Sequence, residues 1–245
     1  MRDVELEISA NERIAEGIYR MVLESRENLT IKPGQFINIR LTGRYLRRPI
    51  SVCDWEDQSL TIVYKVVGAG TGQMSEMRPG EKVKVLLPLG NGFDVKGSGE
   101  RPVLVGGGAG VPPMYGLAKV FINEGITPTV LLGFNGEKDI FYEEAFRTIG
   151  AEVYVATVDG SRGQKGFVTS LLEGLRYTSV YACGPEPMLK AIDDVIPDGI
   201  PAYYSFEERM GCGFGAYMGC SCKTLYGYKR ICKEGPVMER GEIIW

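Results

Sequence analysis

The chain has 245 residues, enough for two domains or one large one with a substantial core. Charged residues make up 24% and hydrophobic residues 44%, which is ordinary for a globular protein, and a net charge of −3 without a basic stripe argues against nucleic acid as a partner. The absence of histidine excludes a Ser-His-Asp triad, a histidine-based metal hydrolase, a haem with a proximal histidine and a Rieske centre.

The N-terminus shows no long apolar stretch of the kind that signal peptides carry, and no apolar run approaches the length of a membrane span. Four of the six cysteines are clustered between residues 212 and 232. This clustering and the missing signal favour reduced thiols over disulfides. We therefore expect a cytoplasmic protein without membrane contact, in which most of these thiols hold a metal or a cluster.

Residues 1–98 are predicted to form a small antiparallel β-barrel. Turn signals such as Pro33-Gly34, Pro79-Gly80 and Asn91-Gly92 separate short apolar stretches. We expect strands at residues 4–8, 18–23, 35–41, 60–67 and 82–87. Many short strands at this spacing are typical of a barrel.

Residues 99–204 are predicted to form a parallel α/β domain, because apolar strands alternate with amphipathic helices. A buried strand at 102–105 leads into a glycine-rich turn, and Pro112-Pro113 opens a helix that Gly125 can end. Further strands are expected at 129–134, 152–158 and 179–182, and helical segments near 142–149, 168–175 and 187–196.

Residues 205–245 are rich in glycine and cysteine and too irregular to form a core of their own. Metal binding supplies the organising free energy in small domains of this kind. Glycine-rich loops that carry several cysteines are typical iron–sulfur cluster holders. We therefore interpret this segment as a cluster-binding domain.

Gly107, Gly108 and Gly110 lie between a strand and a helix, where glycines let the backbone approach a pyrophosphate at the helix N-terminus. The G-x-G-x-x-G fingerprint is incomplete, because Val111-Pro-Pro113 stands where the third glycine belongs. The alternative is a tight strand-to-helix turn without a ligand.

Three further motifs have a functional and a plain structural interpretation. Arg48 can bind a diphosphate, and the Ser51 hydroxyl can form a hydrogen bond to a ring nitrogen; alternatively, both belong to a solvated basic turn. The segments 63–65 and 70–71 offer an aromatic face, a cation and a backbone amide, or are an ordinary strand and turn. Cys183 ends a predicted parallel strand, where α/β sheets bind ligands, or is a buried small hydrophobic residue.

Together, in this order, the motifs resemble those of the ferredoxin-reductase-like flavoproteins: Arg48-x-x-Ser51, Gly70-Thr71, Gly107-Gly-x-Gly110-x-x-Pro113 and Cys183-Gly-Pro185. The tail from residue 205 to 237 resembles the electron-transfer subunit of NAD-linked (class 1B) dihydroorotate dehydrogenase. The resemblance covers essentially the whole chain. It implies an FAD-binding β-barrel, a nicotinamide-binding α/β domain and a C-terminal [2Fe-2S] domain.

The resemblance also implies roles for individual residues. The FAD contacts are Arg48, Pro49, Ile50, Ser51, Val63, Tyr64, Lys65, Gly70 and Thr71. Among these, Arg48, Gly70 and Thr71 would bind the diphosphate, and Ser51 would lie near flavin N5. The nicotinamide nucleotide contacts are Gly107, Gly108, Gly110, Cys183 and Gly184. The negative charge of Asp159, in the region of the adenosine half, favours NAD over NADP.

The cysteine loop departs from the family pattern Cys-x4-Cys-x2-Cys followed by a more distant cysteine. Cys212, Cys220 and Cys232 fit the first, third and last places, but Tyr217 stands in the second. Cys222 becomes the fourth ligand if the loop rearranges. Alternatively, the Tyr217 phenolate or another oxygen completes the iron site, or the cluster is labile or absent.

The function implied is an electron relay in pyrimidine biosynthesis. Electrons from an FMN-containing dihydroorotate dehydrogenase catalytic subunit would pass through the [2Fe-2S] cluster and FAD to NAD⁺, in a heterotetramer with two copies of each subunit. No protein acid or base is needed for hydride transfer. Two alternatives remain: an NAD(P)H:ferredoxin or sulfide-type oxidoreductase subunit with the same cofactors, and a flavin-binding module without a cluster.

Overall fold

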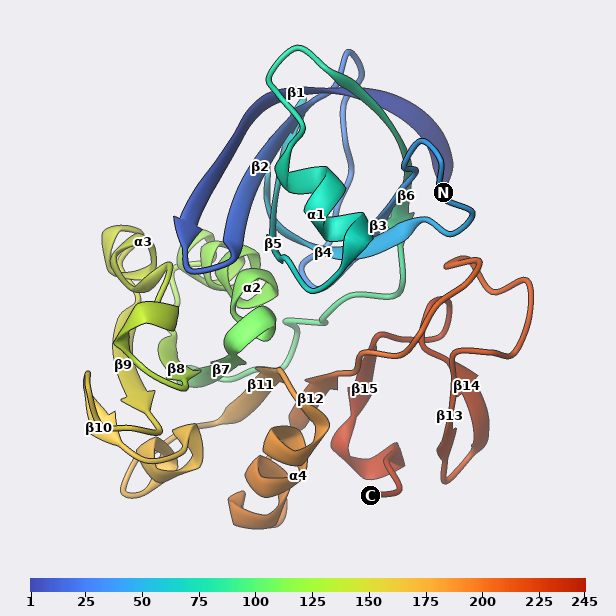
Figure 1. The fold of residues 1–245 in the computed structure, drawn as a ribbon. Coiled ribbons are helices and arrows are strands. Elements are labelled where there is room, and N and C mark those ends of the chain that lie inside the picture. The colour runs from blue at the N-terminus through green and yellow to red at the C-terminus, as the bar shows by residue number, and fades with distance from the viewer.

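A closed antiparallel barrel occupies the N-terminal part of the computed structural model, which describes all residues from 1 to 245 (Figure 1). Its strands are β1 (Arg2–Ala15), β2 (Ile18–Glu24), β3 (Phe36–Ile39), β4 (Arg48–Trp55), β5 (Ser59–Lys65) and β6 (Lys82–Leu89). They follow the order β1-β2-β5-β4-β3-β6 around the barrel, and the short helix α1 (Ala69–Ser75) connects β5 to β6. Successive side chains of a strand point to opposite faces, and the apolar ones point into the barrel. They form a core that includes Ile37, Ile39, Leu60 and Ile62.

A seven-stranded sheet follows the barrel in sequence and lies below it in Figure 1. Its strands are β7 (Pro102–Gly107), β8 (Thr129–Phe134), β9 (Glu152–Thr157), β10 (Gln164–Lys165), β11 (Ser179–Cys183), β12 (Ala202–Ser205) and β15 (Val237–Glu239). The order is β10-β9-β8-β7-β11-β12-β15, and only β15 runs antiparallel to its neighbour. The helices are α2 (Val111–Asn123), α3 (Glu143–Thr148) and α4 (Glu186–Val195).

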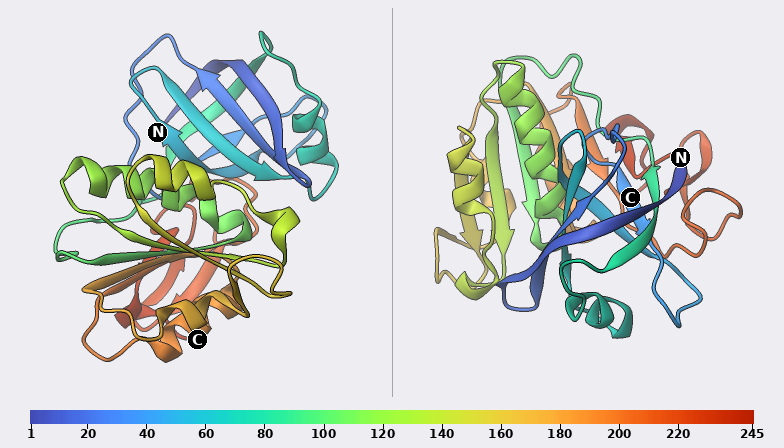
Figure 2. Two further views of the ribbon diagram at one scale, coloured as in Figure 1. Left: turned by 90° about the vertical axis from the view of Figure 1, so that its left-hand side faces the viewer. Right: turned by 90° about the horizontal axis from the view of Figure 1, so that it is seen from above.

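Helix α2 lies between the barrel and the sheet (Figure 2). Gly116 permits this packing, because a Cβ on it would lie 2.6 Å from the Trp55 ring and 2.8 Å from the Cys53 carbonyl oxygen of β4. Lys119 of α2 also forms a 2.6 Å ion pair with Asp54. The barrel strand that carries the predicted flavin motif is therefore fixed against the first helix of the parallel sheet.

The last part of the chain packs on the barrel instead of forming an independent core. β13 (Ser221–Thr224) and β14 (Gly227–Arg230) pair as an antiparallel hairpin that forms a separate two-stranded sheet. The shared core consists of Phe36 and Leu89 from the barrel with Cys220, Ile231, Cys232 and Met238. This arrangement agrees with the expectation that residues 205–245 cannot fill a core alone.

The predicted fold class is confirmed: an antiparallel barrel, a parallel α/β sheet and a small cysteine-containing segment. The segment 168–175 forms a 3₁₀ turn (Val168–Leu172) where we expected a longer helical segment. The helix ends there because Glu173 is extended and Gly174 has a φ of 75°. Strands β4, β10 and β12 to β15 and helix α1 were not predicted. None of the helices has the length and hydrophobicity of a membrane-spanning segment.

Candidate functional site

The predicted diphosphate-binding residues Arg48 and Gly70 lie directly against each other, although 21 residues separate them in the chain. A Cβ on Gly70 would lie 2.0 Å from Arg48 Nε and 2.7 Å from Cζ. The guanidinium therefore occupies the space that any other residue at position 70 would fill. Such a cradle places a cation beside the first turn of α1, which fits the binding of a diphosphate.

The neighbouring residues of this motif have structural partners. The hydroxyl of Thr71 accepts hydrogen bonds from the backbone N–H groups of Val67 (2.9 Å) and Gly68 (3.3 Å), so it caps α1. Arg47 forms an ion pair with Asp3 at 2.7 Å, and this arginine lowers the pKa of the Asp3 carboxyl. Arg48 forms no ion pair, although its Nη1 donates to the Leu46 carbonyl oxygen at 2.8 Å, and the backbone of Thr71 remains available to a ligand.

Strand β4 presents alternate residues to two environments. Ile50 packs against the barrel core, whereas Pro49 and Ser51 belong to the outer face, which continues with Cys53 toward α2. Ser51 is half-buried and accepts or donates no side-chain hydrogen bond within the chain.

Strand β5 also divides its three predicted contacts. Val63 packs with the core around α2, and Lys65 is exposed. Tyr64 is 3% exposed, stacks on Tyr19 and donates a 2.9 Å hydrogen bond to Asn11 Oδ1. The Tyr64 ring thus belongs to the barrel core, which leaves its backbone as the part that can contact a flavin.

The glycine-rich turn after β7 meets the Cys-Gly-Pro segment after β11, as expected for neighbouring parallel strands. A Cβ on Gly110 would lie 2.1 Å from the carbonyl oxygen of Cys183 and 2.6 Å from the Gly184 nitrogen. Gly107 and Gly184 both lie against Met188, whose sulfur would be 2.4 Å from a Cβ on Gly107. The predicted nucleotide-binding glycines thus form one surface, with Gly108 open on it at φ 51°.

Cys183 is 1% exposed, and burial raises the pKa of its thiol to about 12. The nearby carboxylate of Glu207 raises this pKa further, so the thiol is neutral at pH 7. The protein around Glu207 removes part of its hydration, which raises the pKa of its carboxyl as well. Sequence reasoning missed Glu207, whose only signal was its place just after the end of β12.

Asp159 lies in the turn between β9 and β10. Its Oδ1 accepts hydrogen bonds from the Ser161 backbone N–H (2.9 Å) and hydroxyl (2.6 Å), which lower the pKa of the carboxyl. A Cβ on Gly136 would lie 2.5 Å from Asp159 Oδ2, so the two turns after β8 and β9 touch. The carboxylate is held at the carboxyl ends of the sheet strands, where the adenosine half was predicted.

The cysteine loop brings two thiols into contact. The sulfur atoms of Cys220 and Cys232 lie 3.2 Å apart, beyond a disulfide bond, and both side chains are almost fully buried. Burial, contact with Cys220 and the charge of Cys212 raise the pKa of Cys232. Cys220 and Cys232 are therefore in direct contact, and no group of three or more such side chains is preassembled around a metal position.

The thiol of Cys212 has different surroundings from those of Cys220 and Cys232. Partial burial raises the pKa of its thiol, but backbone N–H groups of residues 214–217 stabilise the thiolate and bring the pKa to about 7. The N–H of Ala216 donates to Cys212 Sγ at 3.3 Å. A thiolate is the form that binds iron, so this turn favours the ligand form of Cys212.

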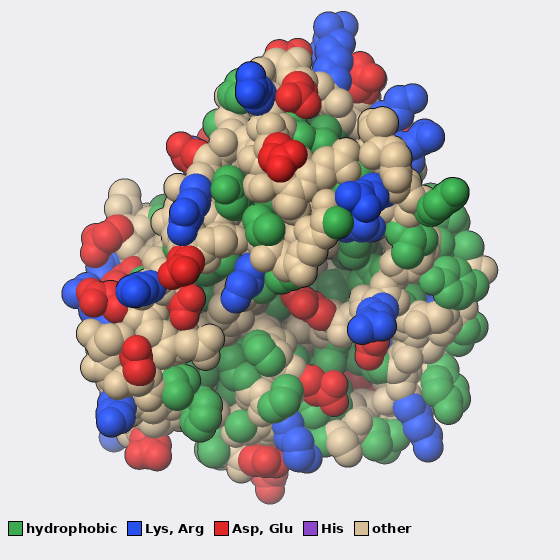
Figure 3. Space-filling model, viewed as in Figure 1, with side chains coloured by type: hydrophobic (Ala, Val, Ile, Leu, Met, Phe, Trp, Pro, Cys, Tyr) green, Lys and Arg blue, Asp and Glu red, His purple; other side chains and the backbone are tan.

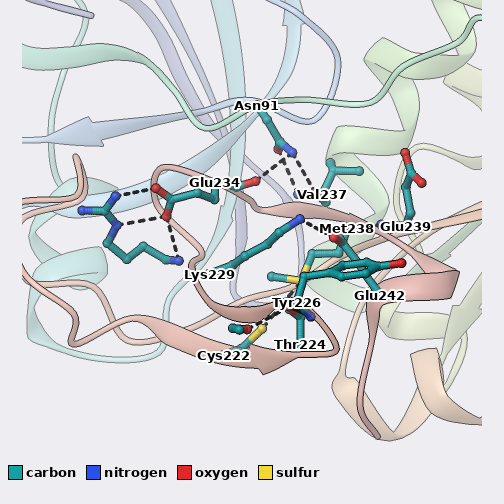
Figure 4. Close-up of polar contacts among 12 residues, drawn as sticks. Asn91, Cys222, Thr224, Tyr226, Lys229, Glu234, Val237, Met238, Glu239 and Glu242 are labelled. Atoms are coloured by element: carbon teal, nitrogen blue, oxygen red, sulfur yellow. Dashed lines mark hydrogen bonds and ion pairs between the residues drawn. The ribbon is translucent and has the colours of Figure 1, made fainter.

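Cys222 and Tyr217 are the two candidates for a fourth ligand, and they lie in different surroundings. The sulfur of Cys222 is 3.6 Å from the sulfur of Met238 (Figure 4). The Tyr217 ring lies between Gly211 and Gly219, where a Cβ on either glycine would be 2.1 Å from it. These glycines immediately precede Cys212 and Cys220, so the phenol packs against the backbone next to two of the clustered thiols.

Asn91, just after the barrel, holds the chain that follows Cys232 (Figure 4). Its Nδ2 donates to the carbonyl oxygens of Glu234 (3.1 Å) and Val237 (2.7 Å), and its Oδ1 accepts from the Val237 N–H at 3.1 Å. Arg230 joins the two sides of the loop by donating to the Gly215 carbonyl oxygen at 2.7 Å and to Glu234 Oε2 at 2.9 Å. The loop that carries the cysteines is therefore attached at several points.

Hydrophobic side chains gather along the right-hand side of the face in Figure 3, over the part of the molecule that contains the cysteine segment. The large exposed apolar residues of this segment are Phe214, Tyr217, Met218, Leu225, Tyr226, Tyr228 and Ile244. Tyr226 is the most exposed of them at 81%. The cysteine segment thus presents a group of exposed apolar side chains on this surface.

The barrel with its Arg48 cradle, the nucleotide-binding sheet and the cysteine loop define an electron-transfer protein of the ferredoxin-reductase-like fold. Two family models match: the oxidoreductase NAD-binding domain over residues 104–194, and the iron-sulfur cluster binding domain of dihydroorotate dehydrogenase B over residues 207–244. The chain belongs to the family of electron transfer subunits of dihydroorotate dehydrogenase B (NAD(+)), as its full-length relatives show. The predicted family is therefore confirmed.

Proteins of that name from Geobacillus sp. (strain WCH70) and Bacillus pumilus (strain SAFR-032) are each 43% identical to the chain. The alignments cover 100% and 99% of this chain and 99% and 98% of those proteins. A solved NADH-dependent reduced ferredoxin-NADP oxidoreductase matches with a TM-score of 0.89 and 29% identity, over 98% of this chain and 90% of the other. Phthalate dioxygenase reductase matches in fold, with a TM-score of 0.67 and 22% identity over 82% and 67%.

Proposed function

We propose that this chain carries electrons between an FMN-containing dihydroorotate dehydrogenase catalytic subunit and NAD⁺, in pyrimidine biosynthesis. One structural observation carries the proposal beyond family membership. Phe36, on the barrel strand paired with the flavin motif, packs in one core with Cys220 and Cys232. A short path between a flavin site and a cluster site is what a relay requires.

The residues fit the three groups FAD, NAD and an iron–sulfur cluster. When bound, the flavin supplies both one-electron and two-electron exchange, which links a one-electron cluster to hydride transfer. Arg48 and the backbone at Gly70 and Thr71 would bind the FAD diphosphate. The surface of Gly107, Gly108, Gly110, Cys183 and Gly184 would bind the nicotinamide nucleotide, and the neutral thiol of Cys183 adds no charge beside it.

We propose the same functional division of the chain as the motifs suggest: residues 1–98 for FAD, 99–204 for NAD and 205–245 for the cluster. The six cysteines are free thiols, which supports a reducing compartment such as the cytoplasm. The name shared by the relatives supports a partner catalytic subunit. We propose that two copies of each subunit form the complex.

For the cluster, we propose that Cys212, Cys220 and Cys232 are ligands and that the phenol of Tyr217 takes the fourth place. Tyr217 is held beside two of these cysteines by Gly211 and Gly219, whereas Cys222 faces Met238. Cys222, the fourth ligand expected from the sequence, becomes a ligand only if β13 moves away from that contact.

The iron content of anaerobically reconstituted protein tests this ligand set. We expect about two irons per chain in the wild type and in Cys222→Ser, fewer in Tyr217→Phe, and full retention in Tyr217→Cys, which restores a fourth thiol. Iron loss in Cys222→Ser with retention in Tyr217→Phe would identify Cys222 as the fourth ligand. A wild type without iron after reconstitution would instead support a flavin module that lacks a cluster.

The relay itself is tested with the purified chain alone and with its partner. Alone, it should transfer electrons from NADH to an artificial acceptor and form no orotate from dihydroorotate. Addition of the catalytic subunit should couple dihydroorotate oxidation to NAD⁺ reduction. Appreciable orotate formation by the isolated chain would contradict the assignment.

A second candidate, a subunit that exchanges electrons between a nicotinamide nucleotide and ferredoxin, is favoured by the TM-score of 0.89 to the ferredoxin-NADP oxidoreductase structure. The two functions share the flavin and nucleotide sites and differ in the partner. Reduced ferredoxin and the dihydroorotate dehydrogenase subunit, supplied separately as electron donors for NAD⁺ reduction, distinguish them.

A further inference from the structure

The outer face of strand β3 connects the flavin motif with the cysteine loop. Ile37 and Ile39 point into the barrel core, so Phe36 and Asn38 belong to the opposite face. Phe36 packs with Cys220 and Cys232 in the core shared with the cysteine loop. The face that carries Asn38 is thus covered by the segment that holds the thiols.

Asn38 is also a direct neighbour of the flavin motif. In the antiparallel pairing of β3 with β4, Asn38 lies opposite Pro49 and Phe36 lies opposite Ser51. Residues that are directly opposite in such a pair share one face of the sheet, with their Cβ atoms about 5 Å apart. The Asn38 side chain therefore stands between the predicted flavin-contacting residues and the cysteine loop.

The amide of Asn38 holds the backbone at the first cysteine of the loop. Its Nδ2 donates a 3.2 Å hydrogen bond to the Cys212 carbonyl oxygen. The next residue, Gly213, has a φ of 74°, and a Cβ on it would lie 2.3 Å from Asn38 Nδ2. The loop thus approaches the amide as closely as glycine allows.

A contribution to folding stability does not explain why a polar amide is buried at Asn38. Asn38 is 1% exposed, and its Oδ1 is buried without a hydrogen-bond partner. A buried unsatisfied acceptor costs about 1–3 kcal/mol, whereas an apolar side chain of similar shape would carry no such penalty. The backbone at this position is held as well, because Arg47 donates to the Asn38 carbonyl oxygen at 3.4 Å and is itself paired with Asp3.

We propose that Asn38 is a positioning residue that fixes the Cys212 turn relative to strand β4, and thereby sets the separation between the flavin and the cluster. The inference rests on the proposed relay function and names a residue in it that no motif marks. Electron transfer between two groups slows steeply as their separation grows. Hydride transfer from the nicotinamide to the flavin does not cross the Cys212 turn, so it should depend less on Asn38.

Rapid mixing of the reconstituted protein with NADH tests the proposal, because flavin reduction and the later cluster reduction have separate absorbance signals. In Asn38→Leu, which keeps the approximate shape and removes the donor, cluster reduction should slow by about tenfold or more relative to flavin reduction, the scale on which small misplacements act. Iron and FAD contents should equal those of the wild type. Asn38→Asp should give the same result, since its carboxylate cannot donate to the Cys212 carbonyl oxygen.

Two further variants complete the experiment. Gly213→Ala displaces the contact between Asn38 and the Cys212 turn from the loop side, so it should also slow cluster reduction. This variant tests the proposal if Asn38→Leu does not fold. Asn123→Leu, at an exposed position at the end of α2, is the control and should change neither phase.

Unchanged cluster reduction in iron-loaded Asn38→Leu would overturn the proposal, and so would loss of iron in that variant, which would indicate a purely structural role. Failure of the proposed function is distinct, because the wild type itself would then show no cluster phase or would not couple to the dihydroorotate dehydrogenase subunit.

Discussion

Replacement of Gly70 by alanine should separate FAD binding from stability. The new Cβ would lie 2.0 Å from Arg48 Nε and 2.8 Å from Nη2, so the guanidinium has to leave its position. The atoms displaced are the far end of a flexible side chain, which can rotate into solvent. The fold should therefore tolerate the change, and alanine in the short helix α1 should offset part of any loss by about 0.5–1 kcal/mol.

The effect on FAD should be larger. A hydrogen bond between a charged group and its partner contributes about 1.5–3 kcal/mol, so loss of the Arg48 contact should weaken FAD binding by about 10- to 150-fold. Flavin fluorescence during titration of the apoprotein measures the Kd, and thermal unfolding of the same apoprotein measures stability.

Gly72→Ala is the matched control, because it lies in the same helix and a Cβ there meets nothing within 4 Å. This variant should bind FAD as the wild type does. Equal Kd values for Gly70→Ala and the wild type, with a folded protein in both cases, would refute the role of Arg48 and Gly70 in binding the diphosphate.

Two further predictions concern the nucleotide-binding sheet. Gly110→Ala places a Cβ 2.1 Å from the Cys183 carbonyl oxygen, a backbone atom that cannot move aside. The affinity for NADH should therefore fall at least tenfold, and the free energy of unfolding should fall by about 1–3 kcal/mol. NADH titrations and thermal melts measure the two effects, and Gly241→Ala, with open space around it, is the control. The thiol of Cys183 should resist iodoacetamide at pH 8 until denaturant is added, as mass spectrometry of the labelled peptides can show, and early labelling would contradict its burial. Because the folded pKa of Cys183 is raised from 9.0 to about 12, its contribution to stability is complete below pH 9 and is lost as the pH rises toward 12.

The sequence predicted the elements whose hydrophobic pattern is strong. Strand β8 matches its expected range of 129–134, since its residues are largely buried on both faces as in other parallel strands. Strand β4 carries Arg48 at one end and Trp55 at the other without a regular alternation, because its two faces meet the barrel core and α2. The hairpin of β13 and β14 contains few apolar residues, so no hydrophobic periodicity predicts it.

The site was predictable as a set of motifs but not as a set of contacts. The order of Arg48, Gly70, Gly110 and Cys183 along the chain indicated the cofactors. The pairing of Gly70 with Arg48 and of Gly110 with Cys183 depends on tertiary packing, which no local pattern encodes. Asn38 was missed for the same reason, since an asparagine within a barrel strand becomes notable only when its partner across 174 residues is known.

The antiparallel pairing of β12 with β15 has a consequence for how this protein can change over evolutionary time. Ser205 pairs with Val237, and the Phe206 N–H donates to the Pro236 carbonyl oxygen at 2.9 Å, so the intervening segment leaves and re-enters the sheet at one point. Loop-closure entropy grows only with the logarithm of loop length. The cysteine-bearing segment is therefore an insertion in a hairpin, and residues can be gained, lost or exchanged within it while the rest of the architecture is inherited unchanged.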